Sequence, residues 1–118
     1  MPQSMPDAPT LLDAAVKYLE DELLPALDGY HRFKTRVTIN VLNVLRRELE
    51  LRGAQAADER KRLAAILGHD GEIDALSTEL SARIRSGAID LNDPALRAHL
   101  RQSVADALAI NNPKWIDR

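Results

Sequence analysis

The amino-acid sequence predicts an all-α protein that folds as a compact bundle of about five antiparallel helices in a single domain. Apolar residues make up 45% of the 118 residues and are mostly Leu and Ala, which favour helices, whereas aromatic residues make up only 3%. Apolar positions recur with helical spacing in five segments, and short connections favour antiparallel neighbours. Residues 1–9, with three prolines, are expected to be a disordered lead-in, and residues 10–118 the helical bundle domain.

The first predicted helix begins at Thr10, which can cap it with Asp13 three residues later. Pro25 and Gly29 are expected to end or kink this segment. Its apolar residues fall within about 140° of arc at 100° per residue, so they should form one buried face. These residues are Leu11, Leu12, Ala15, Val16, Leu19 and Leu23.

Two further helices are predicted over residues 30–51 and 56–67, with Gly53 closing the first of them. The second ends naturally at Gly68. The apolar face of the longer helix consists of Phe33, Val37, Val41, Val44, Leu45 and Leu49, and the shorter helix is anchored by Leu63, Ile66 and Leu67.

The last two predicted helices span residues 72–86 and 94–110. Asp70 can cap the first, and Asp93 followed by Pro94 is a strong start signal for the second. The side chains expected to point inward from the last helix are Leu96, Leu100, Val104, Ala107 and Leu108, and the tail residues Trp115 and Ile116 are expected to dock on the bundle.

Composition excludes several classes of protein. The chain has no cysteine, so it holds no disulfide framework and no thiolate metal site. No apolar run approaches the ~20 residues that span a bilayer, and the N-terminus lacks the pattern of a secretion signal. The net charge of −2 argues against a general nucleic-acid binder. We therefore expect a cytoplasmic protein with no membrane or nucleic-acid partner and no cofactor.

Charge is arranged in blocks along the chain. Residues 1–29 carry one basic and six acidic side chains, whereas residues 30–62 carry nine basic and four acidic side chains. The first two helices could lie side by side and neutralise each other, or the basic block could face an anionic ligand or an acidic partner.

His69 and Asp70 lie together between Gly68 and Gly71. Asp70 could orient His69 as a general base, or the pair could bind a small ligand or a metal. The structural alternative is that Asp70 caps the following helix and His69 is a polar loop residue. A metal site is not predicted, because His31 and His99 lie on other helices without ligand spacing.

A polar row is predicted on the helix over residues 30–51. Arg36, Asn40, Asn43 and Arg47 are spaced so that they fall within about 60° of arc, and together they could bind a phosphate or carboxylate. They could instead bridge to acidic residues of neighbouring helices.

An acidic run, Glu20-Asp21-Glu22, lies near the end of the first helix, where acids oppose the helix dipole unless they are paired. Arg32, Lys34 and Arg36 are the expected pairing partners, and a basic partner surface is the alternative.

Several segments together resemble a family of short bacterial all-helical proteins of unknown function. These segments are residues 18–27, 47–51, 67–71, 90–96 and 108–113. The family carries no catalytic assignment, so no site residue transfers. The resemblance implies a genetic context near aminoglycoside-phosphotransferase-like kinases and acyl-CoA dehydrogenases.

Three hypotheses for function follow. The leading one is a non-catalytic accessory protein that binds a larger metabolic enzyme, either kinase-like or an acyl-CoA dehydrogenase, and a homodimer is also possible. The alternative is a module that binds an anionic ligand of phosphate or CoA type through the polar row. The third is a minor enzyme that uses His69 and Asp70.

Overall fold

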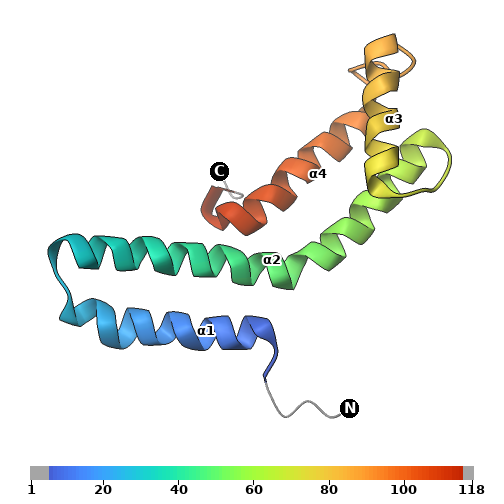
Figure 1. Ribbon diagram of the computed structural model, residues 1–118. Helices are drawn as coiled ribbons and strands as arrows, with labels where there is room; N and C mark the ends of the chain where they lie inside the picture. The colour runs from blue at the N-terminus through green and yellow to red at the C-terminus, as the bar shows by residue number, and fades with distance from the viewer. Residues whose placement is uncertain (1–5, 116–118) are drawn as a thin grey trace. The chain divides into compact units, whose positions relative to one another are not determined.

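The computed structural model describes residues 6–115 and, in that range, confirms the all-α class. The described residues form four α-helices and three short helical turns, with no strand (Figure 1). In order, these elements are α1 (Ala8–Tyr18), the π-helical η1 (Leu19–Leu23), the 3-10 turn η2 (Leu24–Ala26), α2 (Gly29–Leu67), α3 (Ile73–Ser86), α4 (Pro94–Asn111) and η3 (Pro113–Trp115).

The predicted count of five helices is wrong because α2 is continuous where two helices were expected. It runs for 39 residues and passes through Gly53 without a break. Gly53 is not among the glycines with positive φ, and a Cβ added there would meet nothing within 4 Å. A helical glycine costs only about 1 kcal/mol, and the Ala-rich sequence that follows, residues 54–57, favours the helix.

The helix ends follow the predictions in part. Asp93 caps α4 as expected, since its carboxylate accepts from the backbone N–H groups of Ala95 and Leu96 at 2.9 and 3.1 Å. Gly87 ends α3 with a φ of 82°, a left-handed conformation that glycine adopts without strain. The predicted start of the first helix is wrong, because Asp7 caps α1 through the N–H of Thr10 at 3.0 Å.

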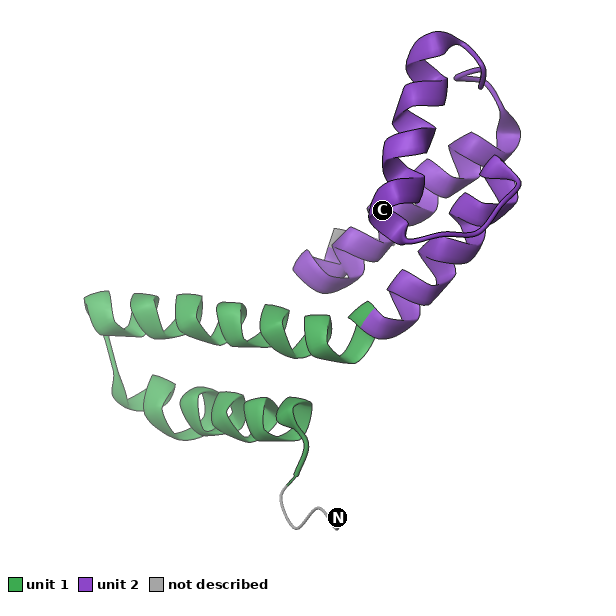
Figure 2. Ribbon diagram, turned by 45° about the vertical axis from the view of Figure 1, so that its right-hand side comes forward, with its two compact units in different colours: residues 1–52 green, residues 53–118 purple. Residues whose placement is uncertain are grey.

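The described chain divides into two compact units, residues 1–52 and 53–118, with the boundary inside α2 (Figure 2). In unit 1, α1 lies antiparallel to the first part of α2 (Figure 1), and Val16 and Ile39 are its buried apolar residues. In unit 2, the end of α2, α3 and α4 surround a leucine core of Leu63, Leu67, Leu76, Leu80 and Leu96. The tail was expected to dock through Trp115 and Ile116. The side chain of Trp115 and all of Ile116 lie outside the described residues.

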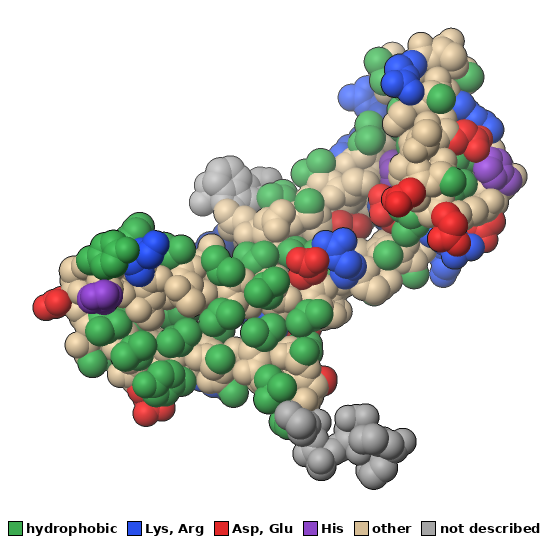
Figure 3. All heavy atoms as spheres, in the orientation of Figure 1, with side chains coloured by type: hydrophobic (Ala, Val, Ile, Leu, Met, Phe, Trp, Pro, Cys, Tyr) green, Lys and Arg blue, Asp and Glu red, His purple; other side chains and the backbone are tan. Residues whose placement is uncertain are grey.

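The predicted apolar face of the long helix is largely exposed in unit 1, and of its members only Val44 is half-buried. We call Tyr30, Phe33, Val37, Val41, Leu45 and Leu49 the apolar face of α2, and these side chains are 42–68% exposed. Ile39, which is only 7% exposed, lies on the side that is packed. Hydrophobic side chains, green in Figure 3, gather along both helices of unit 1 on the side that the figure shows.

Candidate functional site

The side chains of His69 and Asp70 do not contact each other, because each is hydrogen-bonded to other groups. The Nε2 of His69 contacts the Oε1 of Glu79 on α3 at 2.7 Å, and its Nδ1 lies 3.2 Å from the backbone oxygen of Asp70. Both acceptors raise the pKa of His69, the backbone oxygen of Asp70 more than Glu79, because they favour the imidazolium form with two N–H donors. With both ring nitrogens engaged, His69 is not arranged as a general base.

The carboxylate of Asp70 is occupied by other groups. Arg60 of α2 holds it through two contacts, Nε to Oδ1 at 2.9 Å and Nη2 to Oδ2 at 3.2 Å. The backbone N–H of Gly71 donates to Oδ1 at 2.7 Å. Arg60 and then this N–H lower the pKa of Asp70, so it is ionised at neutral pH. The predicted cap is wrong: Glu72 holds the cap position of α3, and Asp70 ties the loop to α2.

The polar row of α2 lies in unit 1 on a different side from the apolar face. Arg36 and Asn40 are exposed, whereas Asn43 and Arg47 are half-buried. Asn43 accepts from Arg46 Nη2 at 3.3 Å, and Arg46 also pairs with Glu50 at 2.9 Å. The row is therefore arranged on one helix, with part of its hydrogen-bonding capacity already used.

The acidic run Glu20-Asp21-Glu22 is exposed in η1, and the ion pairs found among the described residues do not join it to α2. Arg32, expected to pair with it, instead donates to the backbone oxygens of Leu24 and Leu27 at 2.8 and 3.3 Å. These bonds satisfy carbonyl groups at the end of η2 and fix the turn into α2.

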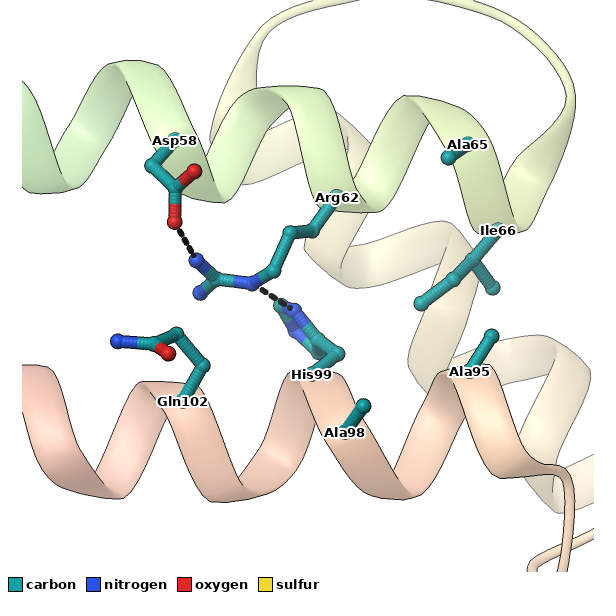
Figure 4. Close-up of a pocket in the computed structure, with 8 residues that line it drawn as sticks. All are labelled: Asp58, Arg62, Ala65, Ile66, Ala95, Ala98, His99 and Gln102. Carbon is teal, nitrogen blue, oxygen red and sulfur yellow. Dashed lines mark hydrogen bonds and ion pairs between the residues drawn. The ribbon is translucent and has the colours of Figure 1, made fainter.

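A polar cluster that sequence reasoning missed lies between α2 and α4 in unit 2 (Figure 4). His99 is only 6% exposed, and its Nδ1 accepts from the Nε of Arg62 at 3.1 Å. Arg62 also pairs with Asp58, and its Nη2 lies 3.8 Å from Asp106 Oδ2. Burial first, and then the positive charge of Arg62, lower the pKa of His99, so it is neutral at pH 7.

The pocket beside this cluster has a volume of about 450 Å³. Its walls are mainly small and apolar, and the polar groups gather at one end, as Figure 4 shows. The lining residues are Asp58, Arg62, Ala65, Ile66, Ala95, Ala98, His99 and Gln102. The buried Nη2 of Arg62 has no hydrogen-bond partner, so one donor remains available here.

The sequence did contain a signal for this cluster. Leu96, His99, Ser103, Asp106 and Ile110 are spaced 3, 4, 3 and 4 residues apart, and all are buried or half-buried. The predicted inner face of this helix is right at Leu96, which is fully buried, and wrong at Leu100 and Val104, which are 47% and 60% exposed. The packed side of α4 carries the polar residues His99, Ser103 and Asp106, so a search for hydrophobic residues alone does not find its helical spacing.

A second hollow, of about 310 Å³, lies in unit 1 beside the apolar face of α2. Leu12 of α1 lines it, together with Leu45, Glu48, Leu49 and Arg52 of α2. Its lining is mainly leucine with an ion pair at the edge, Arg52 Nη2 to Glu48 Oε1 at 2.9 Å. This composition is typical of a recess that receives an apolar side chain rather than a charged ligand.

The described residues contain no group of three or more His, Asp or Glu side chains able to hold a metal ion. Among the described residues, no helix is long and apolar enough to cross a membrane.

The comparisons with known proteins agree with the predicted resemblance to a family of unknown function. No curated protein and no solved structure matches the chain. One family matches residues 25–115, which is well over half of the sequence. The matched range includes part of η2 and the whole of α2, α3 and α4. The chain therefore belongs to the family described as "Domain of unknown function (DUF6285)".

Proposed function

We propose that the protein is a non-catalytic interaction protein, an accessory to a larger metabolic enzyme. The observation that carries the proposal is the apolar face of α2, six large apolar side chains that are 42–68% exposed along one helix. Contiguous exposed apolar surface on a water-soluble helix is typical of a protein–protein contact, because its burial is favourable.

The geometry of the polar candidates supports a binding role over catalysis. Both ring nitrogens of His69 contact acceptors, and Asp70 is held by Arg60 and Gly71, so neither is placed to accept a proton from a substrate. His99 is buried against Arg62 on α2, which uses its Nδ1 lone pair.

The family resemblance supplies the candidate partners. It implies a context of kinase-like enzymes and acyl-CoA dehydrogenases, and an accessory subunit of such an enzyme needs an exposed apolar surface of this kind. The exposed acids of η1, Glu20, Asp21 and Glu22, add a negatively charged rim that favours a partner with basic residues beside its own apolar patch.

The test is a calorimetric titration of the purified protein into the purified kinase-like enzyme and the purified acyl-CoA dehydrogenase, with activity assays of both. We expect one enzyme to bind it, and Val41→Glu to abolish this binding. Val104→Glu is the matched control, since Val104 is a similarly exposed valine on α4. If neither enzyme binds or changes activity, the proposal fails.

A second candidate function is the binding of an anionic ligand by the polar row, favoured by the exposure of Arg36 and Asn40 on the same side of α2. Coenzyme A is the probe. Replacing Arg36 and Arg47 with Ala should abolish its binding while the helical content stays unchanged, and Lys61→Ala should bind as the wild type does. Equal binding by all three proteins rejects this candidate.

A further inference from the structure

We infer that the apolar face of α2 is covered by a second copy of this chain, packed antiparallel on the same face about a two-fold axis that passes by Val41. The inference rests on the proposed function, because both treat this face as a docking surface. It adds that a second copy of the chain binds there. An enzyme that binds through this face would then displace the second copy.

The face is exposed along α2 and borders α1 only near Leu45 and Leu49, where Leu12 of α1 lines the hollow with them. At 100° per residue, Ile39, which is buried in unit 1, lies about 160° around α2 from Val41. Val37 and Leu45 lie about 40° to either side of Val41, so a half-exposed apolar centre faces away from the packed side. This arrangement leaves room for another helix along α2.

The charges around Val41 are self-complementary. Lys34 and Glu48 are each seven residues from Val41, which places them about 10 Å away along the helix and about 20° to either side of it. In an antiparallel pair, Lys34 of each copy is therefore brought to Glu48 of the other. A parallel pair would set Lys34 against Lys34 and Glu48 against Glu48, so charge selects the antiparallel arrangement.

The ends of the face repeat this relation. At one end, the Nζ of Lys34 lies 6.0 Å from the ring centroid of Tyr30. At the other end, Glu48 pairs with Arg52 at 2.9 Å. Tyr30 and Arg52 are equally far from Val41, so the antiparallel copy brings the guanidinium of one chain to the exposed phenol ring of the other.

The hollow beside Leu45 and Leu49 is a recess at one end of the face. This recess is completed by Leu12 of α1 and has a volume of about 310 Å³. The antiparallel copy brings its Tyr30 and Phe33, 68% and 63% exposed, to the same level along α2. These aromatic side chains add apolar area to be buried at both ends of the face, and a two-fold axis uses each such contact twice.

The first test is the mass of the protein alone by sedimentation velocity over a range of concentrations. The wild type should reach twice the chain mass, and Val41→Glu should raise the dissociation constant at least ~100-fold, because it sets two carboxylates face to face at the axis. Val104→Glu should dimerise as the wild type does, and circular dichroism should show equal helical content in all three. A monomeric wild type, or a dimeric Val41→Glu, overturns the inference.

In the second test the single charge reversals report the orientation, because a parallel pair already has like charges together, and a mixture reports whether this face pairs. Lys34→Glu and Glu48→Lys should each dimerise less tightly alone, because each places like charges together. A mixture of the two should form mixed dimers in native mass spectrometry, since every contact across the axis is then between opposite charges. Lys61→Glu, outside unit 1, should leave dimerisation unchanged. Statistical mixing without any preference shows that the copies pair through another surface.

These tests separate the inference from the proposed function. A monomer that binds the enzyme through Val41 rejects the dimer and leaves the accessory role intact. A dimer that binds neither enzyme rejects the accessory role and leaves the dimer intact.

Discussion

His99 is a buried histidine whose neutral form is part of the packing between α2 and α4. Its Nδ1 accepts from Arg62 Nε at 3.1 Å, and an imidazolium would have no lone pair to accept that bond and would repel the guanidinium. Burial and Arg62 together lower its pKa below the ordinary value of about 6.5. The residue therefore links the stability of unit 2 to pH.

The free energy of unfolding should fall as the pH is lowered below about 6.5, because the unfolded chain then binds a proton that folded His99 does not bind. One histidine contributes at most about 1.4 kcal/mol per pH unit to this slope. Urea denaturation of the wild type and of His99→Gln between pH 7 and pH 5 measures it. His99→Gln keeps an acceptor for Arg62 without titrating, so its slope should be smaller, and equal slopes would show that His99 binds a proton equally well in the folded and the unfolded chain.

His69 and His99 should titrate on opposite sides of the ordinary value for histidine. The pKa of His69 is raised by the backbone oxygen of Asp70 and by Glu79, whereas the pKa of His99 is lowered. Imidazole proton resonances followed by NMR against pH report both. Glu79→Gln should lower the pKa of His69 and leave that of His99 unchanged, and a His69 pKa at or below about 6.5 in the wild type would contradict its two-donor arrangement.

The pairing of His69 and Asp70 shows what adjacency in sequence fails to fix. The sequence gives two titratable neighbours, but the partners that engage them, Glu79 and Arg60, lie ten residues away on either side. Only the packing of the loop between α2 and α3 brings those side chains within reach. The local pattern shows that both residues are polar, whereas the contacts that set their protonation come from residues distant in the sequence.

At the scale of elements, the ends of helices are more predictable than their continuity. Asp93-Pro94 and Gly87 act through local backbone geometry, so their effects could be read from the sequence. Gly53 could not, because the same residue ends a helix only when its φ is positive, and in α2 it is not. The surrounding helix formers decide the outcome.

Gly53→Ala should therefore stabilise the protein by about 1 kcal/mol, since alanine loses less conformational entropy in a helix. An added Cβ meets no atom within 4 Å. Gly87→Ala is the matched control, because at a φ of 82° the same change should destabilise the protein by about 1 kcal/mol. Denaturation midpoints in urea measure both, and a destabilised Gly53→Ala would mean that the helix breaks there.

The packed faces of α2 and α4 were harder to predict than their existence. In α4, the packed side carries His99, Ser103 and Asp106, so hydrophobicity pointed to the exposed Leu100 and Val104 instead. In α2, the predicted apolar face exists but remains exposed in unit 1. Both errors have the same cause. A pattern of hydrophobic residues shows which side of a helix can be buried, whereas the neighbouring elements determine which side is buried.

At the scale of the whole molecule, the exposed apolar face of α2 adds nothing to the stability of an isolated chain. Leaving large apolar side chains in water forgoes about 25 cal/mol per Å² of burial. The family to which the chain belongs has no assigned function. The exposed face leads to the hypothesis that the protein works by contact with another protein, first with a second copy of itself.

The most direct measurement is hydroxyl-radical footprinting of the wild type at high concentration and of monomeric Val41→Glu, with modification read by mass spectrometry. We predict that Tyr30, Phe33, Leu45 and Leu49 react quickly in the variant and are protected in the wild type. Leu91, which is 66% exposed in unit 2, should react equally in both. Equal reactivity of the apolar face in the two proteins, with and without the enzyme partner, would contradict its role as a docking surface.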